Sequence, residues 1–288
     1  MADVVRDLLR NKTIFFAGDS IEVELFDFGR CALWREGLAM QSQYREAFFD
    51  FAAVHALGHM KEFLVVPEYR AALQLTDIGH LLPSRRDPGS ISSVFAFADI
   101  VLASFGLHFS GVPWAQFEAK MVETWTQLNE FGARPGKLAL YREVPLQHFQ
   151  GTGHYDAGAY SRRYGKDAAA RASCECEAQE QQYNRGVRNA TWWPCDRNKR
   201  CPTPRGMNDL FRNLTRRFPH VRLVPFEALT RPRHKTHVGA DKGANCDCTH
   251  SCWTPEFADA FATGLYGVIE EGLRERVVES LSDARSAA

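Results

Sequence analysis

Two stretches far apart in the chain together hold the residue types of a nucleophilic acyl-transfer centre. Near the start, Gly18-Asp19-Ser20 offers a serine hydroxyl. A serine attacks a carbonyl when a base removes its proton and an acid orients that base. Near the end, Asp247 and His250 are three residues apart, so on one helical turn they would lie side by side. The pattern predicts a centre made of Ser20, His250 and Asp247. A helix-capping serine and a surface loop are the alternatives without chemistry.

A third stretch, Ser104-Phe105-Gly106-Leu107-His108, could complete this site. The tetrahedral intermediate of acyl transfer carries an oxyanion that backbone N–H groups stabilise. We expect the N–H groups of Ser20 and Gly106 to be these donors, because a glycine lets the backbone approach closely. We expect His108 to line the pocket, a buried structural histidine being the alternative.

Short apolar runs that end at turn residues predict the strands that must position these groups. The first, residues 13–18, ends directly before Asp19 and Ser20, and a packed helix follows it. The clearest helix begins with Thr254 as cap and Pro255 as first helical residue. Alternating strands and helices predict an α/β fold with a central parallel sheet, in which ligands bind at the carboxyl ends of the strands. Further strands are predicted at 63–66, 100–105, 137–142 and 221–226, with an amphipathic helix at 114–128.

Seven of the eight cysteines lie at or beyond position 174, in the polar second half of the chain. Such clustering predicts disulfides that hold long loops, and therefore an oxidising compartment. Three N-x-[ST] sequons, at Asn11, Asn189 and Asn213, agree with a secretory route. A zinc site is the alternative, because Cys or His stands at every second residue from Cys246 to Cys252.

The composition is that of a globular protein, with 45% hydrophobic and 24% charged residues among 288. This excludes wholesale disorder. No run of about 18 apolar residues is present, so no membrane span is expected. The first residues are charged where a signal peptide would be apolar. We expect a single domain over 1–288, with a long Cys-containing loop insertion at about 150–205, where periodicity is weak.

The net charge is zero, but residues 160–240 hold 17 Lys and Arg against 7 Asp and Glu. A basic segment of this kind binds an acidic partner or forms a solvated insertion. No aromatic stacking platform accompanies the charge, so no nucleic-acid partner is expected. An anionic lipid or an acidic glycan would also suit this charge, and our hypothesis is an acidic polysaccharide, such as a chain that contains uronates.

The order of these motifs resembles that of the SGNH (GDSL-type) hydrolase superfamily. More narrowly, residues 15–20, 105–109 and the string Asp247-Cys248-Thr249-His250-Ser251-Cys252 resemble the PC-esterase family. That family includes the plant trichome-birefringence-like polysaccharide O-acetyltransferases and the Cas1-type sialate O-acetyltransferases. Residues 142–149 are similar to a further family segment, an Arg followed by a Pro-x-His-Phe-like run, and the resemblance spans about residues 13–266. Plant members usually carry an Arg shortly after the serine, where this chain has Ile21, Glu22 and Val23, and a Trp where it has Ser251.

The resemblance implies a three-layer flavodoxin-like (SGNH) fold and catalysis by Ser20, His250 and Asp247 without a metal or other cofactor. Asp19, His108 and His148 are the expected pocket residues. It also implies O-acyl chemistry, chiefly on O-acetyl groups, in which a glycan or polysaccharide is the substrate of a transferase or an esterase. A disulfide-bonded glycoprotein in the Golgi lumen or outside the cell is expected. The sequence names neither the acyl donor nor the sugar. Two other functions stay open: an inactive glycan-binding module on the same fold, and a zinc-dependent deacetylase.

Overall fold

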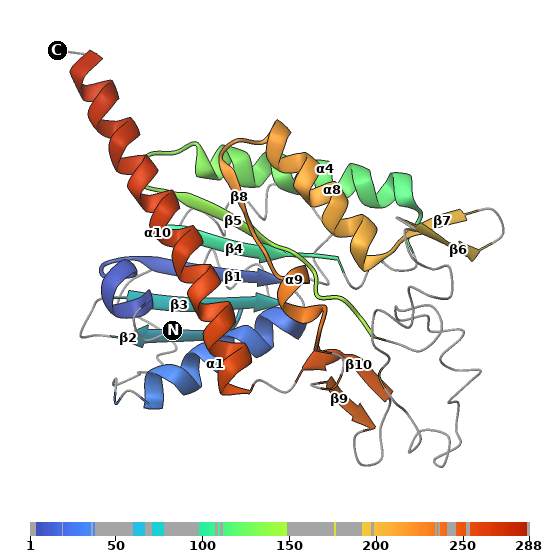
Figure 1. Cartoon of the computed structure of the whole chain (residues 1–288). Coiled ribbons are helices and arrows are strands. Elements are labelled where there is room, and N and C mark those ends of the chain that lie inside the picture. The colour runs from blue at the N-terminus through green and yellow to red at the C-terminus, as the bar shows by residue number, and fades with distance from the viewer. Residues whose placement is uncertain are drawn as a thin grey trace.

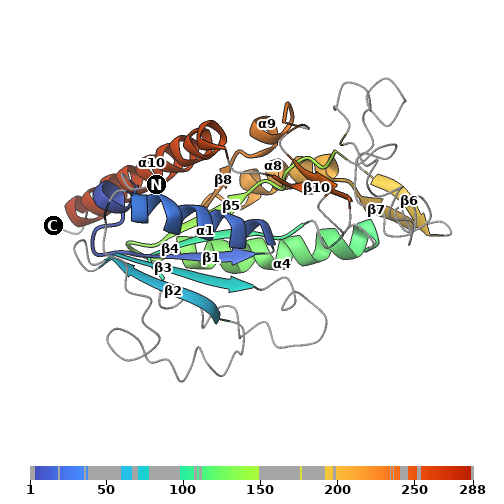
Figure 2. The same cartoon turned by 90° about the horizontal axis from the view of Figure 1, so that it is seen from below.

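The computed structural model is an α/β structure built on a six-stranded sheet (Figures 1 and 2). The structure describes residues 4–18, 20–35, 37, 60–66, 71–77, 98–106, 109, 112–148, 176, 192–196, 199–233, 235, 237–240, 246–251 and 254–286.

The elements are, in chain order, the π-helix η1 (Val4–Leu8), β1 (Thr13–Gly18), α1 (Ser20–Arg35), β2 (Met60–Val66), β3 (Ala71–Asp77), β4 (Ile100–Ser104), α4 (Trp114–Gly132), β5 (Leu138–Arg142), β6 (Trp192–Asp196), β7 (Lys199–Pro202), α8 (Pro204–Arg217), β8 (Val221–Val224), α9 (Glu227–Thr230), β9 (His237–Ala240), β10 (Cys246–Ser251) and α10 (Pro255–Ser286).

The strand order of the main sheet is β2-β3-β1-β4-β5-β8. All neighbours run parallel except β2, which is antiparallel to β3 at the edge of the sheet. Parallel strands end at the same side, so the loops that follow β1, β4, β5 and β8 leave from one edge. That edge is where ligands bind in open α/β sheets.

Helices cover both faces of the sheet, which gives three layers. Along β1, Phe16 packs with residues of α1 and α10, whereas Phe15 packs with residues of α4 and α8. Successive strand residues point to opposite faces, so a strand covered on both sides is apolar throughout. This explains the continuous burial of β1. Figure 1 shows α10 crossing the sheet on the α1 side.

The predicted strands at 13–18, 100–105, 137–142 and 221–226 are confirmed within two residues as β1, β4, β5 and β8. The strand predicted at 63–66 is confirmed as part of β2, but β2 is the one antiparallel strand of an otherwise parallel sheet. β2 starts at Met60 and only residues 67–70 separate it from β3, too few for the crossover that a parallel neighbour needs. β3 and α8 are not among the predicted elements. Residues 150–205 were predicted to be loop, whereas β6 and β7 form an antiparallel hairpin there.

Candidate functional site

The carboxyl ends of β1 and β4 lie side by side, and two of the three chemical stretches begin there. Gly18 pairs with Ser104 in the parallel register. α1 begins at Ser20, and Phe105 and Gly106 directly follow β4. The first N–H groups of a helix have no acceptor within the helix, so the turn that starts at Ser20 presents backbone donors. The prediction that Ser20 starts a helix after a buried strand is confirmed.

The third stretch lies on β10, which reaches the same edge by a different route. β5 ends at Arg142, and the chain continues to His148, whose N–H donates to the carbonyl of Cys248 over 3.0 Å. Figure 1 shows β9 and β10 below the ends of β1 and β4, at the end of the sheet where those strands stop. The described parts of the three predicted stretches therefore lie at the same end of the sheet.

The local structure of this third stretch differs from the expectation. Asp247 and His250 were expected in a single loop, side by side as on one helical turn, but they lie on a strand that pairs antiparallel with β9. Its register shifts between Asp247 and Ser251, an irregularity of the kind that re-aims side chains in a strand. The side chains of Ser20, Asp247 and His250 lie outside what the structure describes, and so do Asp19 and His108 as whole residues. That Ser20, His250 and Asp247 lie within hydrogen-bond reach of one another stays a prediction.

The candidate oxyanion residue Gly106 is buried, and its neighbour is held in place by a phenol. The hydroxyl of Tyr141 accepts from the N–H of Phe105 over 3.0 Å and donates to the Phe105 carbonyl over 2.7 Å. A Cβ added at Gly106 would lie 2.4 Å from Cγ1 of Val144, so this position has no room for a side chain. In the described part of the chain, the N–H of Gly106 has no hydrogen-bond acceptor. Gly106 thus presents a backbone donor on a fixed, crowded turn.

The first turn of α1 is tied to the end of β5 by a buried ion pair. Nε and Nη2 of Arg142 both lie 2.7 Å from Oε1 of Glu22, and neither side chain is exposed. The guanidinium also lies 4.6 Å from the ring centroid of Phe226 and donates to the carbonyl of Glu143. A Cβ at Gly18 would lie 2.4 Å from Oε2 of Glu22, so Gly18 makes room for this carboxylate. The pair fixes the turn that carries Ser20.

Residues Arg142–His148, which we call the bridge segment, are buried throughout although they extend past the sheet. Buried backbone outside a sheet must find other hydrogen-bond partners. The side chain of Asn208 on α8 accepts from the N–H of Val144 and donates to its carbonyl. The hydroxyl of Thr230 on α9 accepts from the N–H of Leu146 over 3.0 Å. Side chains from two helices therefore hold the middle of the bridge segment.

Two buried carboxylates anchor the same segment to α9. Oε2 of Glu143 accepts from the N–H groups of Phe226 and Glu227, where α9 begins. Glu227 in turn binds Arg231 over 2.7 Å and Arg212 over 2.6 Å. Burial raises the pKa of Glu227, but hydrogen bonds from Arg231 and then Arg212, with their positive charges, outweigh it and leave the pKa lowered. Glu227 is therefore held as a carboxylate.

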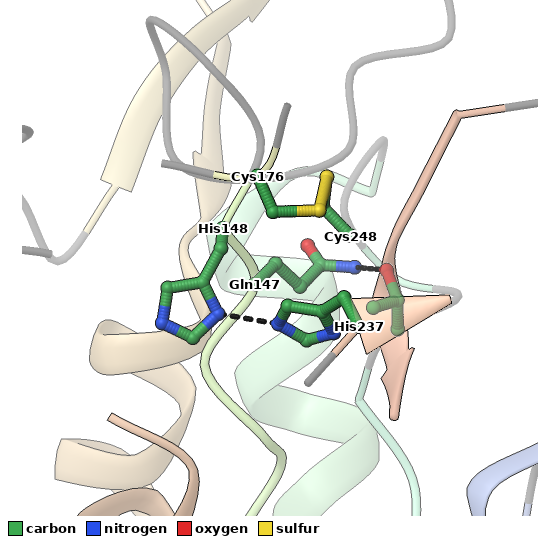
Figure 3. The surroundings of a disulfide bond; sticks show 6 residues. Gln147, His148, Cys176, His237 and Cys248 are labelled. Carbon is green, nitrogen blue, oxygen red and sulfur yellow. Dashed lines mark hydrogen bonds between the residues drawn. A yellow bond between two sulfur atoms is a disulfide. The ribbon is translucent and has the colours of Figure 1, made fainter. Parts of the chain in front are cut away.

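The far end of the bridge segment contacts β9 and β10 (Figure 3). Nε2 of Gln147 donates to the hydroxyl of Thr249 over 2.7 Å, and Nδ1 of His148 lies 2.5 Å from Nε2 of His237. Nε2 of His148 lies 3.1 Å from the carbonyl oxygen of Arg231, which can only accept, so this nitrogen carries a proton. In the neutral pair His148 then accepts at Nδ1 and His237 donates. Protein groups therefore contact both ring nitrogens of His148, one of the three residues expected to line the pocket.

A disulfide between Cys176 and Cys248 also holds β10 (Figure 3). The predicted use of cysteines as disulfides is confirmed for this pair, which joins residues 72 positions apart. Because Cys248 is oxidised, it cannot be the thiolate ligand that the alternative zinc site needs. Among the described residues no group of three or more His, Cys, Asp or Glu could hold a metal ion. Cys31 is an exposed free thiol.

Part of the positive charge of residues 160–240 is used inside the protein. Arg212 binds Glu143 and Glu227, and Arg222 binds Glu271 and Glu275 of α10. These arginines are structural ion-pair partners, and the charge left for an acidic ligand is smaller than the sequence count suggests.

No model of a known protein family matches the chain, and no curated protein matches it significantly. Among the helices that the structure describes, none combines the length and apolarity needed to cross a bilayer.

The sequence analysis did not single out Gln147 or His237, and it noted Glu22 only as a departure from the plant pattern. A carboxylate in the first turn of a helix usually interacts favourably with the helix dipole. Glu22 fits that ordinary explanation, so its sequence position does not indicate a buried ion pair. Gln147 lies inside the recognised segment 142–149, whereas His237 lies ten residues before the string 247–252 and carries no signal of its own.

Proposed function

We propose that this protein is an acyl-transfer enzyme of the SGNH type, which moves O-acyl groups, chiefly O-acetyl, on or off a glycan or polysaccharide. Ser20 is the nucleophile, His250 the base and Asp247 the residue that orients the His250 ring. The N–H groups of Ser20 and Gly106 stabilise the oxyanion. One observation supports this best. The start of α1, the turn at Gly106 and β10 lie at the same end of a sheet that helices cover on both faces.

The reaction proceeds in two steps through an acyl-serine. His250 accepts the hydroxyl proton while Oγ of Ser20 attacks the acyl carbonyl, and the alcohol of the donor leaves with that proton. His250 then removes a proton from water or a sugar hydroxyl, whose oxygen attacks the acyl carbonyl. The bond between the acyl group and Oγ of Ser20 breaks, and Oγ takes the proton from His250, which restores the serine hydroxyl. Water as acceptor makes the enzyme an esterase, and a sugar makes it a transferase.

The disulfide supports a place in the secretory lumen or outside the cell, where thiols are oxidised. Exposed Asn11 and Asn213 are the sequons on described residues, so glycosylation is compatible with their positions.

Reaction with a fluorophosphonate probe tests the proposal, because the probe labels an activated serine. We expect one adduct on Ser20, found by peptide mass analysis, and none in Ser20→Ala. An unlabelled wild-type protein that still binds glycans would instead indicate the glycan-binding module. Incubation with acetylated and unacetylated glycans, with acetate followed by mass, separates esterase from transferase.

A further inference from the structure

We propose that the bridge segment, Arg142–His148, sets the position of β10 relative to the first turn of α1, and that Arg142 and Gln147 are positioning residues. The inference rests on the proposed function, because it concerns how the base and the nucleophile are aligned. It assigns no contact with substrate to either residue.

Each end of the bridge segment holds one half of the proposed centre. At its start, Arg142 binds Glu22, two residues after Ser20 on the same turn. At its end, Gln147 binds the hydroxyl of Thr249, the residue before His250. The N–H of His148 binds the carbonyl of Cys248, the residue after Asp247. One short segment therefore contacts the residues next to Asp247 and His250, and a residue two positions after Ser20.

The segment cannot slide between these two ends. The N–H of Glu143 donates to the carbonyl of Val224, Asn208 holds both polar groups of Val144, and Thr230 holds the N–H of Leu146. Pro145 has no N–H to satisfy and a restricted φ. A shift by one residue would leave several buried polar groups without partners, each at a cost comparable to a lost hydrogen bond.

If the bridge segment were only structural, its buried backbone would still need hydrogen-bond partners. Those partners would not have to come from α1 and β10, the two elements that carry Ser20, Asp247 and His250. Oxyanion stabilisation and proton transfer are sensitive to displacements near 1 Å, which can cost about 100-fold in rate. Loss of a contact at either end should therefore slow the chemistry more than it lowers stability.

The test compares the rate of fluorophosphonate labelling of Ser20 across matched variants of the full chain. Gln147→Leu and Thr249→Val each remove the contact from one side, and Thr249→Ser keeps the hydroxyl. We expect about 10–100-fold slower labelling in the first two, near wild-type labelling in Thr249→Ser, and no further loss in the double variant, because both changes remove one interaction. If Gln147→Leu fails to fold, the labelling rates of Thr249→Val and Thr249→Ser still test the inference, because these two variants differ in the hydroxyl that Gln147 binds.

Asp99→Ala is the matched control for stability. Asp99 accepts from the N–H of Thr13 over 2.8 Å and binds Lys137 at the opposite, amino edge of the sheet. We expect this variant to melt at a lower temperature with labelling unchanged. The inference is overturned if folded Gln147→Leu and Thr249→Val are labelled at the wild-type rate, or if Asp99→Ala slows labelling as much. Absence of labelling in the wild type overturns the proposed function, and the inference with it.

Discussion

Glu22 and Arg142 form an ion pair that no solvent reaches, between residues 120 positions apart. Removing two charges from water costs several kcal/mol, so a hydrophobic pair of similar volume would be about as stable or more so. A contribution to stability therefore does not by itself explain why an ion pair is buried at the turn that carries Ser20. Its geometric effect is to tie the first turn of α1 to the end of β5.

Replacing one member of this pair should destabilise the fold strongly. In Arg142→Met the Glu22 carboxylate stays buried without its cation, and we expect the free energy of unfolding to fall by about 3–5 kcal/mol. The double variant Arg142→Met/Glu22→Leu should recover most of that loss. Denaturant unfolding measures both changes. Equal losses in the single and double variants would show that packing of the arginine, and not its charge, is what matters.

A substitution at Ser104, at the same end of the sheet, should raise the free energy of unfolding. Its side chain is fully buried, and in the described part of the chain its hydroxyl has no hydrogen-bond partner. Ser104→Ala removes this unsatisfied group at little loss of packing, so we expect a gain of about 1 kcal/mol in thermal or denaturant unfolding. Thr203→Ala is the control, because that buried hydroxyl accepts from the N–H of Gly206 and caps α8. It should lose about 1 kcal/mol. A loss in both variants would argue that Ser104 has a partner in solution.

The sequence predicts the elements whose signals are local. The apolar run of β1, the proline before α4 and the Thr254 cap of α10 each lie within a few residues of the element they mark. α8 had such a signal too. Thr203 caps it, Pro204 starts it and buried Met207, Phe211 and Leu214 recur along one face, but the surrounding charge obscured this pattern.

The contacts around the site could not be predicted in the same way, because they join distant residues. Nothing near Gln147 in the sequence indicates that it binds Thr249, 102 positions away, or that His148 meets His237. The third stretch shows the limit most clearly. The spacing of Asp247 and His250 fits a helical turn, yet pairing with β9 makes that stretch a strand. Tertiary pairing overrides a local preference of this kind.

Acid should weaken the anchor between the bridge segment and α9. The pKa of Glu227 is lowered from 4.5 in the folded protein, so its ion pairs contribute stability that is fully present above about pH 4.5 and is lost as the pH falls through the folded pKa. Glu227→Gln should be less stable than wild type by about 1–2 kcal/mol at pH 7, because two half-exposed arginines supply a partly screened attraction. Unfolding measured from pH 7 to pH 3 should show this gap narrowing below pH 4.5. A gap that stays constant with pH would mean that the charge of Glu227 is not what stabilises the contact.

Loss of the disulfide should lower stability without any effect of chelators. Cys176 and Cys248 close a loop of 72 positions, and the chain-entropy relation gives about 4 kcal/mol for a loop of that length. We expect Cys176→Ala/Cys248→Ala, or reduction with dithiothreitol, to lower the melting temperature, and EDTA to leave it unchanged. A drop with EDTA and none with reductant would restore the zinc alternative.

The three proposed catalytic residues should behave as one unit when they are removed together. Ser20→Ala should lower turnover of an acetyl ester by about 10⁴–10⁶-fold, because Ser20 is the proposed nucleophile that carries the acyl group. His250→Ala should cost a similar factor, and the double variant should be no slower than Ser20→Ala, since a base without its nucleophile has no function. Asp247→Asn should lose less, because it removes the charge that orients His250 but leaves Ser20 and His250 in place. Cys31→Ser, at an exposed thiol, is the control and should match wild type. If the losses of Ser20→Ala and His250→Ala multiply in the double variant, the two residues act independently, and the acyl-serine mechanism is wrong.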